Sequence, residues 1–297
     1  MKEYGDKYRL LSKGRHYLRI VPFVLGVQFV LHSCLPDPLE VKNIPAAEPQ
    51  IVVNTQIIPD RSLVVFLTRT FGALEASDDS DPFDLIASIS VNDAQVTIEG
   101  PATRDTLLFL AHGIYGGVNI PLVAGEEYTL YVKSHSLGSV KATTTVTPQV
   151  LFKSLELERY FNGFDDTLVQ VSYSIEDPAL KNQYMINVQR ISFTENVEEQ
   201  LLNPRVYTRL IDDEDYDGTV IADTLRATPR DYAAGDTVAV FLSNINELYY
   251  DFIKLRLDNR VGFVEFVSEP VNYPSNVEGG RGFFNLHIPD IRFFVLE

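Results

Sequence analysis

The chain has 297 residues, and its 41 acidic and 25 basic side chains give a formal net charge of −16 at pH 7. Nucleic acids and anionic membrane surfaces are bound mainly through Lys and Arg, so this charge argues against both as direct partners, while it favours solubility. The single cysteine excludes an internal disulfide, and no cluster of cysteines is available to bind a metal.

The first 33 residues have the order expected of a bacterial lipoprotein signal peptide. Six Lys and Arg residues precede an apolar run over residues 20–31, which is too short to span a bilayer core of about 30 Å. A lipobox is formed by Leu31, Ser33 and Cys34, with the unusual His32 between them. We therefore expect cleavage after Ser33 and lipid on the Cys34 thiol, which would anchor the protein to a membrane. The alternative is a buried lone cysteine after a chance apolar stretch.

Removing residues 1–33, which contain six basic and two acidic residues, would leave 264 residues with a net charge of −20. Residues 34–48 are then predicted to be a lipidated, semi-rigid tether, because prolines restrict its backbone. The remainder is predicted to form two domains, an N-terminal one over residues 49–148 and a C-terminal one over residues 149–297.

The N-terminal domain is predicted to consist of short strands. Candidates with many β-branched residues cover 51–58 and 63–68, joined by a turn at Pro59-Asp60, and another candidate covers 86–98 after an acidic loop at 78–84. Alternation places Tyr128, Leu130 and Val132 on one face of a strand, and likewise Ala142, Thr144 and Val146 on the next. This pattern is typical of a β-sandwich.

The C-terminal domain repeats the pattern and adds one helix. The sets that alternate are residues 155–157, 169–175, 184–188 and 238–242, and the last strand candidates are 261–267 and 291–296. Helical spacing from Ile245 to Leu255, with Asn244 as the N-cap, predicts a packing helix. The predicted fold class is therefore all-β, with two tandem immunoglobulin-like β-sandwich domains and one packing helix in the second.

Several short motifs, taken in this order, carry a family resemblance. They are Gly125-Glu126-Glu127-Tyr128-Thr129-Leu130, Asp212-Asp213 with Asp217-Gly218, Gly235-Asp236-Thr237-Val238, Tyr249-Tyr250-Asp251-Phe252, Pro270-Val271-Asn272, Pro274-Ser275-Asn276-Val277, and Gly279-Gly280 before Gly282-Phe283-Phe284. The chain resembles DUF4249, a family of Bacteroidota lipoproteins of unknown function. The resemblance covers nearly all of the mature chain, and the last block is its most specific part.

The resemblance implies an outer-membrane lipoprotein that is often encoded beside a SusC-like TonB-dependent transporter. It implies no catalytic activity. The histidines that follow the signal peptide are His112, His135 and His287, none of them in a metal-binding pair, and no Gly-x-Ser-x-Gly motif is present. We therefore expect that the protein is not an enzyme and has no cofactor besides its covalent lipid.

One segment resembles the first half of a calcium-binding loop. Asp213, Asp215 and Asp217 alternate before Gly218, a spacing that can turn carboxylates toward one hard cation. The second half of the motif fails, since Thr224 stands where a bidentate Glu belongs. Calcium binding and an exposed acidic turn are both open, and the acidic turn is favoured.

The glycine-rich block is the weak candidate for a partner-binding loop, formed by Gly279, Gly280, Arg281, Gly282, Phe283 and Phe284. Glycines free the backbone and two aromatic rings offer contact area. The alternative, which we favour, is a bulge or tight turn with both rings in the core.

The sequence therefore predicts a non-catalytic accessory subunit on the cell surface, anchored by lipid to the outer membrane. Its partner would be an outer-membrane β-barrel, first of all a TonB-dependent nutrient importer. The alternative is a module that captures a glycan or peptide ligand and passes it to the transporter, and a hydrolase is a third class.

Overall fold

The structure is a computed structural model that describes residues 48–58, 62–71, 82–117, 119–163, 167–191, 206–228, 232–259 and 272–297. All of them belong to the compact unit Ala47–Glu297. The signal peptide, Leu31, Ser33, Cys34 and the tether up to residue 47 lie outside the described residues, as do the predicted turn at 59–60 and the predicted strand at 261–267. Among the described residues, no helix has the length and apolarity to cross a membrane.

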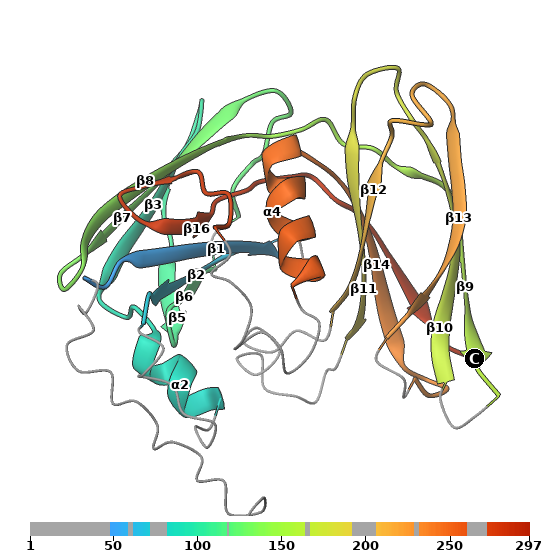
Figure 1. Ribbon diagram of the computed structural model, residues 1–297, viewed down its shortest axis with the longest axis horizontal. Coiled ribbons are helices and arrows are strands. Elements are labelled where there is room, and N and C mark those ends of the chain that lie inside the picture. Colours follow the sequence, from blue (N-terminus) through green and yellow to red (C-terminus); the bar gives the residue numbers. More distant parts are fainter. Residues whose placement is uncertain are drawn as a thin grey trace, which may run out of the picture. The chain divides into compact units, whose positions relative to one another are not determined.

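The first sandwich consists of two five-stranded sheets, with strand orders β16-β1-β2-β6-β5 and β15-β8-β7-β3-β4 (Figure 1). Its strands are β1 (Ile51–Ile57), β2 (Leu63–Arg69), β3 (Ala94–Glu99), β4 (Arg104–Thr106), β5 (Leu108–Ala111), β6 (Ile114–Gly116), β7 (Glu127–Ser134), β8 (Gly138–Thr145), β15 (Val277–Glu278) and β16 (Arg281–Phe283). The predicted inward faces are confirmed, because Tyr128, Leu130, Val132, Ala142 and Val146 all lie in its buried core.

The prediction of a strand over residues 86–98 was wrong in its first part. Residues Pro82–Ile89 form the helix α2, and the strand begins only at Ala94. Ser88 and Ser90 donate side-chain hydrogen bonds to carbonyls of Leu85 and Ile86 in the preceding turn. A short apolar run such as this one does not distinguish a strand from a helix by its pattern alone.

The second sandwich pairs a three-stranded sheet, β13-β10-β9, with a four-stranded sheet, β12-β11-β14-β17. Its strands are β9 (Phe152–Phe161), β10 (Thr167–Glu176), β11 (Gln183–Ile191), β12 (Val206–Asp212), β13 (Val220–Ala227), β14 (Thr237–Ile245) and β17 (Asp290–Val295). The alternating residues predicted for β10, β11 and β14 form its core. The all-β class with two sandwiches is thereby confirmed.

The predicted packing helix is α4 (Glu247–Asp258), but its N-cap is Asn246 rather than Asn244. The Asn246 side chain accepts a hydrogen bond of 2.9 Å from the Tyr249 amide, as an N-cap does. Asn244 is still part of β14. Tyr249 and Phe252 are the buried residues of the helix, and they pack with Met185 of β11 and Phe283 of β16.

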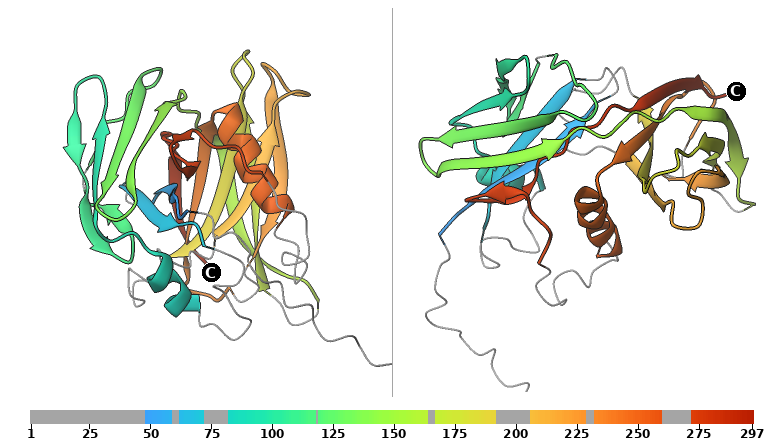
Figure 2. Two further views of the ribbon diagram at one scale, coloured as in Figure 1. Left: turned by 60° about the vertical axis from the view of Figure 1, so that its left-hand side comes forward. Right: turned by 90° about the horizontal axis from the view of Figure 1, so that it is seen from above.

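The end of the chain returns to the first sandwich, which corrects the predicted assignment of all residues after 149 to the second. β16 pairs in parallel with β1, and β15 pairs with β8; Figure 1 shows the red β16 beside the blue β1. Phe284 and Leu286 belong to the first core. The chain then continues into β17, which pairs with β14 (Figure 2).

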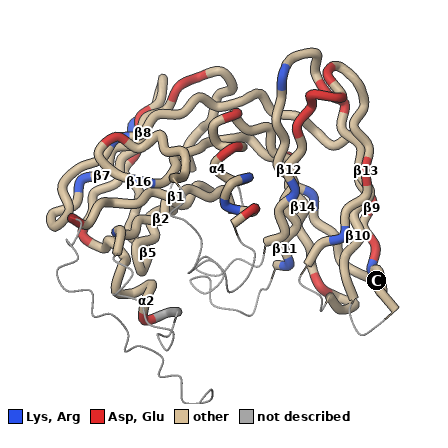
Figure 3. Tube along the Cα trace, in the orientation of Figure 1, with Lys and Arg blue, Asp and Glu red and all other residues tan. Residues whose placement is uncertain are grey.

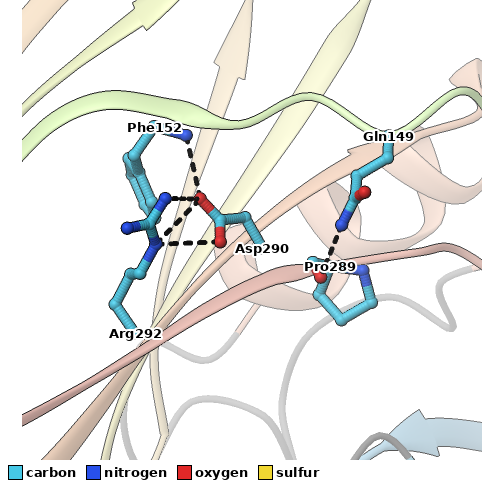
Figure 4. A network of polar contacts seen from close by, with 5 residues as sticks. All are labelled: Gln149, Phe152, Pro289, Asp290 and Arg292. Carbon is cyan, nitrogen blue, oxygen red and sulfur yellow. Dashed lines mark hydrogen bonds and ion pairs between the residues drawn. The ribbon is translucent and has the colours of Figure 1, made fainter.

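Polar side chains hold this returning segment in place. Asn276 donates to the carbonyls of Thr143 and Phe284 and accepts from the Phe284 amide. Further along, Gln149 donates a 3.1 Å hydrogen bond to the Pro289 carbonyl, and Asp290 accepts from the Phe152 amide and from Arg292 (Figure 4). The segments around residues 149–152 and 289–292 are thereby tied to each other.

The parallel pairing of β16 predicts that Gly282 cannot be replaced. Its φ is +91°, and an added Cβ would lie 1.9 Å from the Val53 carbonyl oxygen, so Gly282→Ala must separate β16 from β1. Because steric overlap adds to a left-handed backbone cost of about 1–2 kcal/mol, we expect a lower thermal midpoint in differential scanning calorimetry. Gly125→Ala is the matched control, because Gly125 has a φ of +84° and no atom within 4 Å of the added Cβ. Equal thermal midpoints for the two variants would contradict the close approach of Gly282 to the Val53 carbonyl oxygen.

Candidate functional site

The predicted calcium segment forms the turn that joins β12 to β13, where Figure 3 shows acidic residues gathered. In this turn Asp213 is buried, whereas Asp215 and Asp217 are exposed. The carboxylates that come together are those of Asp213, Asp217 and Asp177, which follows β10; one oxygen of each lies within 4.8 Å of the others. Asp215 is not part of this group, and Asp177 stands in its place.

Hydrogen bonds from neighbouring segments hold the two buried carboxylates. Asp177 accepts from the Tyr184 hydroxyl and, at 2.9 Å, from the Gly218 amide. Asp213 accepts from the Asn182 amide. Burial raises the pKa of Asp213, and the carboxylates of Asp177, Asp212 and Asp217 act in the same direction. Burial also raises the pKa of Tyr184, which therefore stays protonated and acts as a donor.

These contacts tie the acidic turn to the segment from Asp177 to Tyr184. Three converging carboxylates are the donor type that hard cations prefer, and Asp177, Asp213 and Asp217 are the residues that could hold one. Thr224, which stands at the position of the bidentate Glu in the calcium motif, lies on β13 and pairs with Ser172 of β10. Sequence reasoning missed Asp177 because it lies in another segment, outside the Asp-x-Asp-x-Asp pattern.

The glycine-rich block exposes Gly279 and Arg281 but buries its two aromatic rings. Phe283 and Phe284 are buried, in the α4 cluster and in the first core respectively. Gly280 and Gly282 are needed for close approach to β1, because an added Cβ would meet the carbonyl oxygens of Ile51 and Val53. The favoured interpretation, with both rings in the core, agrees with these contacts, and the two rings are not available to a partner.

The three histidines lie on three different segments. His112 is in the turn between β5 and β6, His135 is in the turn between β7 and β8, and His287 lies between β16 and β17. His287 is buried, and its Nδ1 accepts a 3.0 Å hydrogen bond from the Asn285 side-chain amide. Burial lowers its pKa to about 4, so the ring is neutral at pH 7.

An apolar strand at the edge of the first sandwich was not anticipated. Among the described strands, β5 pairs only with β6, and its Leu108, Phe109 and Leu110 are 58%, 50% and 49% exposed. Natural edge strands are usually protected by charges, prolines or bulges. β5 has a bulge between Phe109 and Ala111 but carries no charged residue. Three successive exposed apolar side chains of this size mark a candidate contact surface.

The sequence and the fold were compared with known proteins. The family model described as "Domain of unknown function (DUF4249)" matches residues 37–287. No curated protein matches the chain. Among solved structures, a two-domain fibronectin type III segment of chicken tenascin is 14% identical, covers 67% of this chain and 91% of its own, and has a TM-score of 0.19. The chicken interferon gamma receptor alpha chain is 11% identical, covers 67% and 90%, and also has a TM-score of 0.19.

The raised pKa of Asp213 predicts how the acidic turn affects stability. A carboxyl group whose pKa is higher in the folded than in the unfolded state stabilises the fold fully at pH values below the unfolded-state pKa of about 3.9. This contribution is lost as the pH rises through the pKa of the folded state. We therefore expect Asp213→Asn to raise the thermal midpoint at pH 7 and to flatten its change between pH 4 and 7. Asp215→Asn, at an exposed position, is the control.

The same melts distinguish a cation site from an acidic turn. If millimolar calcium raises the midpoint of the wild type but not that of Asp213→Asn, the cluster binds the ion. A midpoint that is unchanged by calcium and by chelator, together with the gain in Asp213→Asn, supports the structural role.

Proposed function

Because the chain belongs to the DUF4249 family, whose function is unknown, we propose that it is a non-catalytic accessory lipoprotein of the outer membrane. It would be anchored by lipid on Cys34, exposed at the cell surface and bound to an outer-membrane β-barrel, namely a SusC-like TonB-dependent nutrient importer. The signal peptide, the lipobox and the tether of the sequence support the anchor.

The exposed apolar edge strand β5 is the observation that supports protein binding over chemistry. Leu108, Phe109 and Leu110 form a continuous apolar stretch, and the outer side of the strand pairs with none of the described strands. A partner can add a strand to such an edge or cover it with apolar side chains, and both remove apolar area from water. At about 25 cal/mol per Å² of apolar area, this contact would contribute several kcal/mol.

The charge of the mature chain is consistent with this arrangement. A net charge of −20 after residue 33 disfavours direct contact with anionic headgroups. Covalent lipid would therefore hold the protein at the membrane, while β5, which has no charged residue, would contact the barrel.

Capture of a glycan or peptide is the second candidate function. It is favoured by a groove on the outward face of β1 and β2 that is lined by two arginines and three aromatic rings. Such a module would deliver its ligand to the same barrel, so the two functions are compatible. A hydrolase would instead show turnover that is lost when a specific carboxylate pair is replaced.

The anchor predicts the chemical state of Cys34 in native cells. Mass spectrometry of the protein purified from its own outer membrane should find an N-terminal peptide that begins at Cys34 and carries fatty acyl chains. Cys34→Ser should leave the signal peptide uncleaved, because lipid transfer to the thiol precedes cleavage. An intact, unacylated thiol on the native protein, or a protein that is freely soluble in its cells, would overturn the proposal.

The edge strand predicts which substitutions release the partner. Leu108→Glu combined with Leu110→Glu should lower the amount of barrel that copurifies in mild detergent by about tenfold, since central apolar contacts dominate binding energy. Leu180→Glu is the matched control, because Leu180 is 73% exposed and lies in the connection between β10 and β11 of the second sandwich. If both variants retain a stoichiometric barrel, or if the wild type has none, β5 is not the docking strand.

A further inference from the structure

A groove of about 660 Å³ runs between the outward face of the first sandwich and helix α4. On its sheet side, Val52 of β1 is opposite Thr68 of β2, and Asn54 is opposite Phe66. On its helix side are Phe252 and Arg256, which are one helical turn apart and so share a face. The size is within the range of pockets that enclose small ligands.

Three aromatic rings give the groove an apolar surface. Phe252 packs against Phe283, with ring centroids 5.2 Å apart, and edge to face against Tyr273, at 6.1 Å. Phe66 faces the groove from β2. Phe66 is held by β2, and the buried Phe252 is held against Phe283, which is fixed in β16 beside β1. The partly exposed rings of Phe66 and Tyr273 can therefore contact apolar side chains of a ligand.

Two arginines supply positive charge in this groove. The Arg256 guanidinium lies 5.5 Å from the centroid of the Phe252 ring, within the range of a cation–π contact. Arg281 donates from Nε to the Gln50 side chain at 3.3 Å, which leaves its terminal nitrogens for another acceptor. Among the described residues, neither arginine forms an ion pair, whereas Arg190, Arg209 and Arg292 each contact an aspartate.

These two guanidinium groups place positive charge on one groove of a chain with 41 acidic and 25 basic residues. Guanidinium groups bind carboxylates through charge-assisted, often bidentate hydrogen bonds. Two arginines are too few for a nucleic acid, which needs many cations along its backbone. The charge of the groove therefore fits a ligand with one or two carboxylates.

The remaining lining groups define the rest of the ligand. Asn54, Thr68, Thr70 and Ser275 add amide and hydroxyl groups along the same groove, which can hydrogen-bond to peptide units. From this combination we infer that the groove binds a short acidic peptide, with its carboxylates on Arg256 and Arg281 and its apolar side chains on Phe66 and Tyr273. The inference deepens the ligand-capture function proposed above and does not depend on the docking of β5 to a barrel.

The test measures binding of one defined peptide to the purified full-length protein in detergent. The probe is acetyl-Phe-Glu-Leu-Glu-amide, which has two carboxylates, and the control peptide is acetyl-Phe-Gln-Leu-Gln-amide, which has the same shape without the charges. Isothermal titration and saturation-transfer NMR should show saturable binding of the acidic peptide that weakens with added salt. The neutral peptide should bind at least tenfold more weakly.

Variants assign the binding to the groove. Arg256→Gln with Arg281→Gln should weaken binding of the acidic peptide at least tenfold, whereas Arg226→Gln should change it less than twofold, because Arg226 lies over Tyr160 in the other sandwich. Arg281→Glu alone, at an exposed position, is the second variant in case loss of the Arg256 contact with Phe252 lowers stability. It should abolish measurable binding.

Three results would each overturn the inference: equal affinity for the two peptides, unchanged affinity in both groove variants, or no saturable binding at millimolar peptide. Copurification of the barrel is a separate readout. Its persistence in Arg281→Glu would show that the accessory function holds whether or not the groove binds a peptide.

Discussion

The close approach of β16 to β1 is the constraint on which the rest of the described structure depends. An added Cβ at Gly280 or Gly282 would lie 2.5 Å or 1.9 Å from a carbonyl oxygen of β1, so this parallel pairing requires glycine at both positions. Phe283 and Phe284, which follow Gly282, point in opposite directions, as neighbouring residues in a strand do. Phe284 enters the core of the first sandwich, and Phe283 enters the cluster under α4.

Hydrogen bonds make this return specific. Asn285 exchanges two backbone hydrogen bonds with the Thr55 hydroxyl of β1, accepts from the N-cap Asn246 of α4 and donates to the buried His287. Buried polar groups cost free energy unless they are paired, so the returning segment fits only where these partners are available. Protonation of His287 at Nδ1 would remove the acceptor of the Asn285 side-chain amide. Burial lowers the pKa of His287 to about 4, so this acceptor is kept at pH 7.

Local patterns in the sequence predicted the elements that bury one face, and missed those defined by distant contacts. Strands β7, β10, β11 and β14 contain the predicted alternating buried residues, because period-two burial is visible in a single segment. The return of β15 and β16 to the first sandwich was missed because these strands are two and three residues long, which is too short for a pattern. β12 was also not predicted. Six of its seven residues are half-buried and the seventh is exposed, so buried and exposed residues do not alternate along it. Asp177 is far from Asp213 and Asp217 in the sequence, so only the folded structure shows that it belongs to the acidic cluster.

The sheet with strand order β16-β1-β2-β6-β5 carries both surfaces that we assign to binding. The groove uses the outward face of its β1 and β2 and the arginine of β16, and the apolar docking strand is its far edge, β5. Ligand capture and partner contact would therefore use one continuous hydrogen-bonded sheet. Because β16 supplies Arg281 and positions Phe283 against Phe252, the glycines that admit β16 also build the groove. The block from Gly279 to Phe284 is thus needed for the groove that we propose, although its own rings are buried.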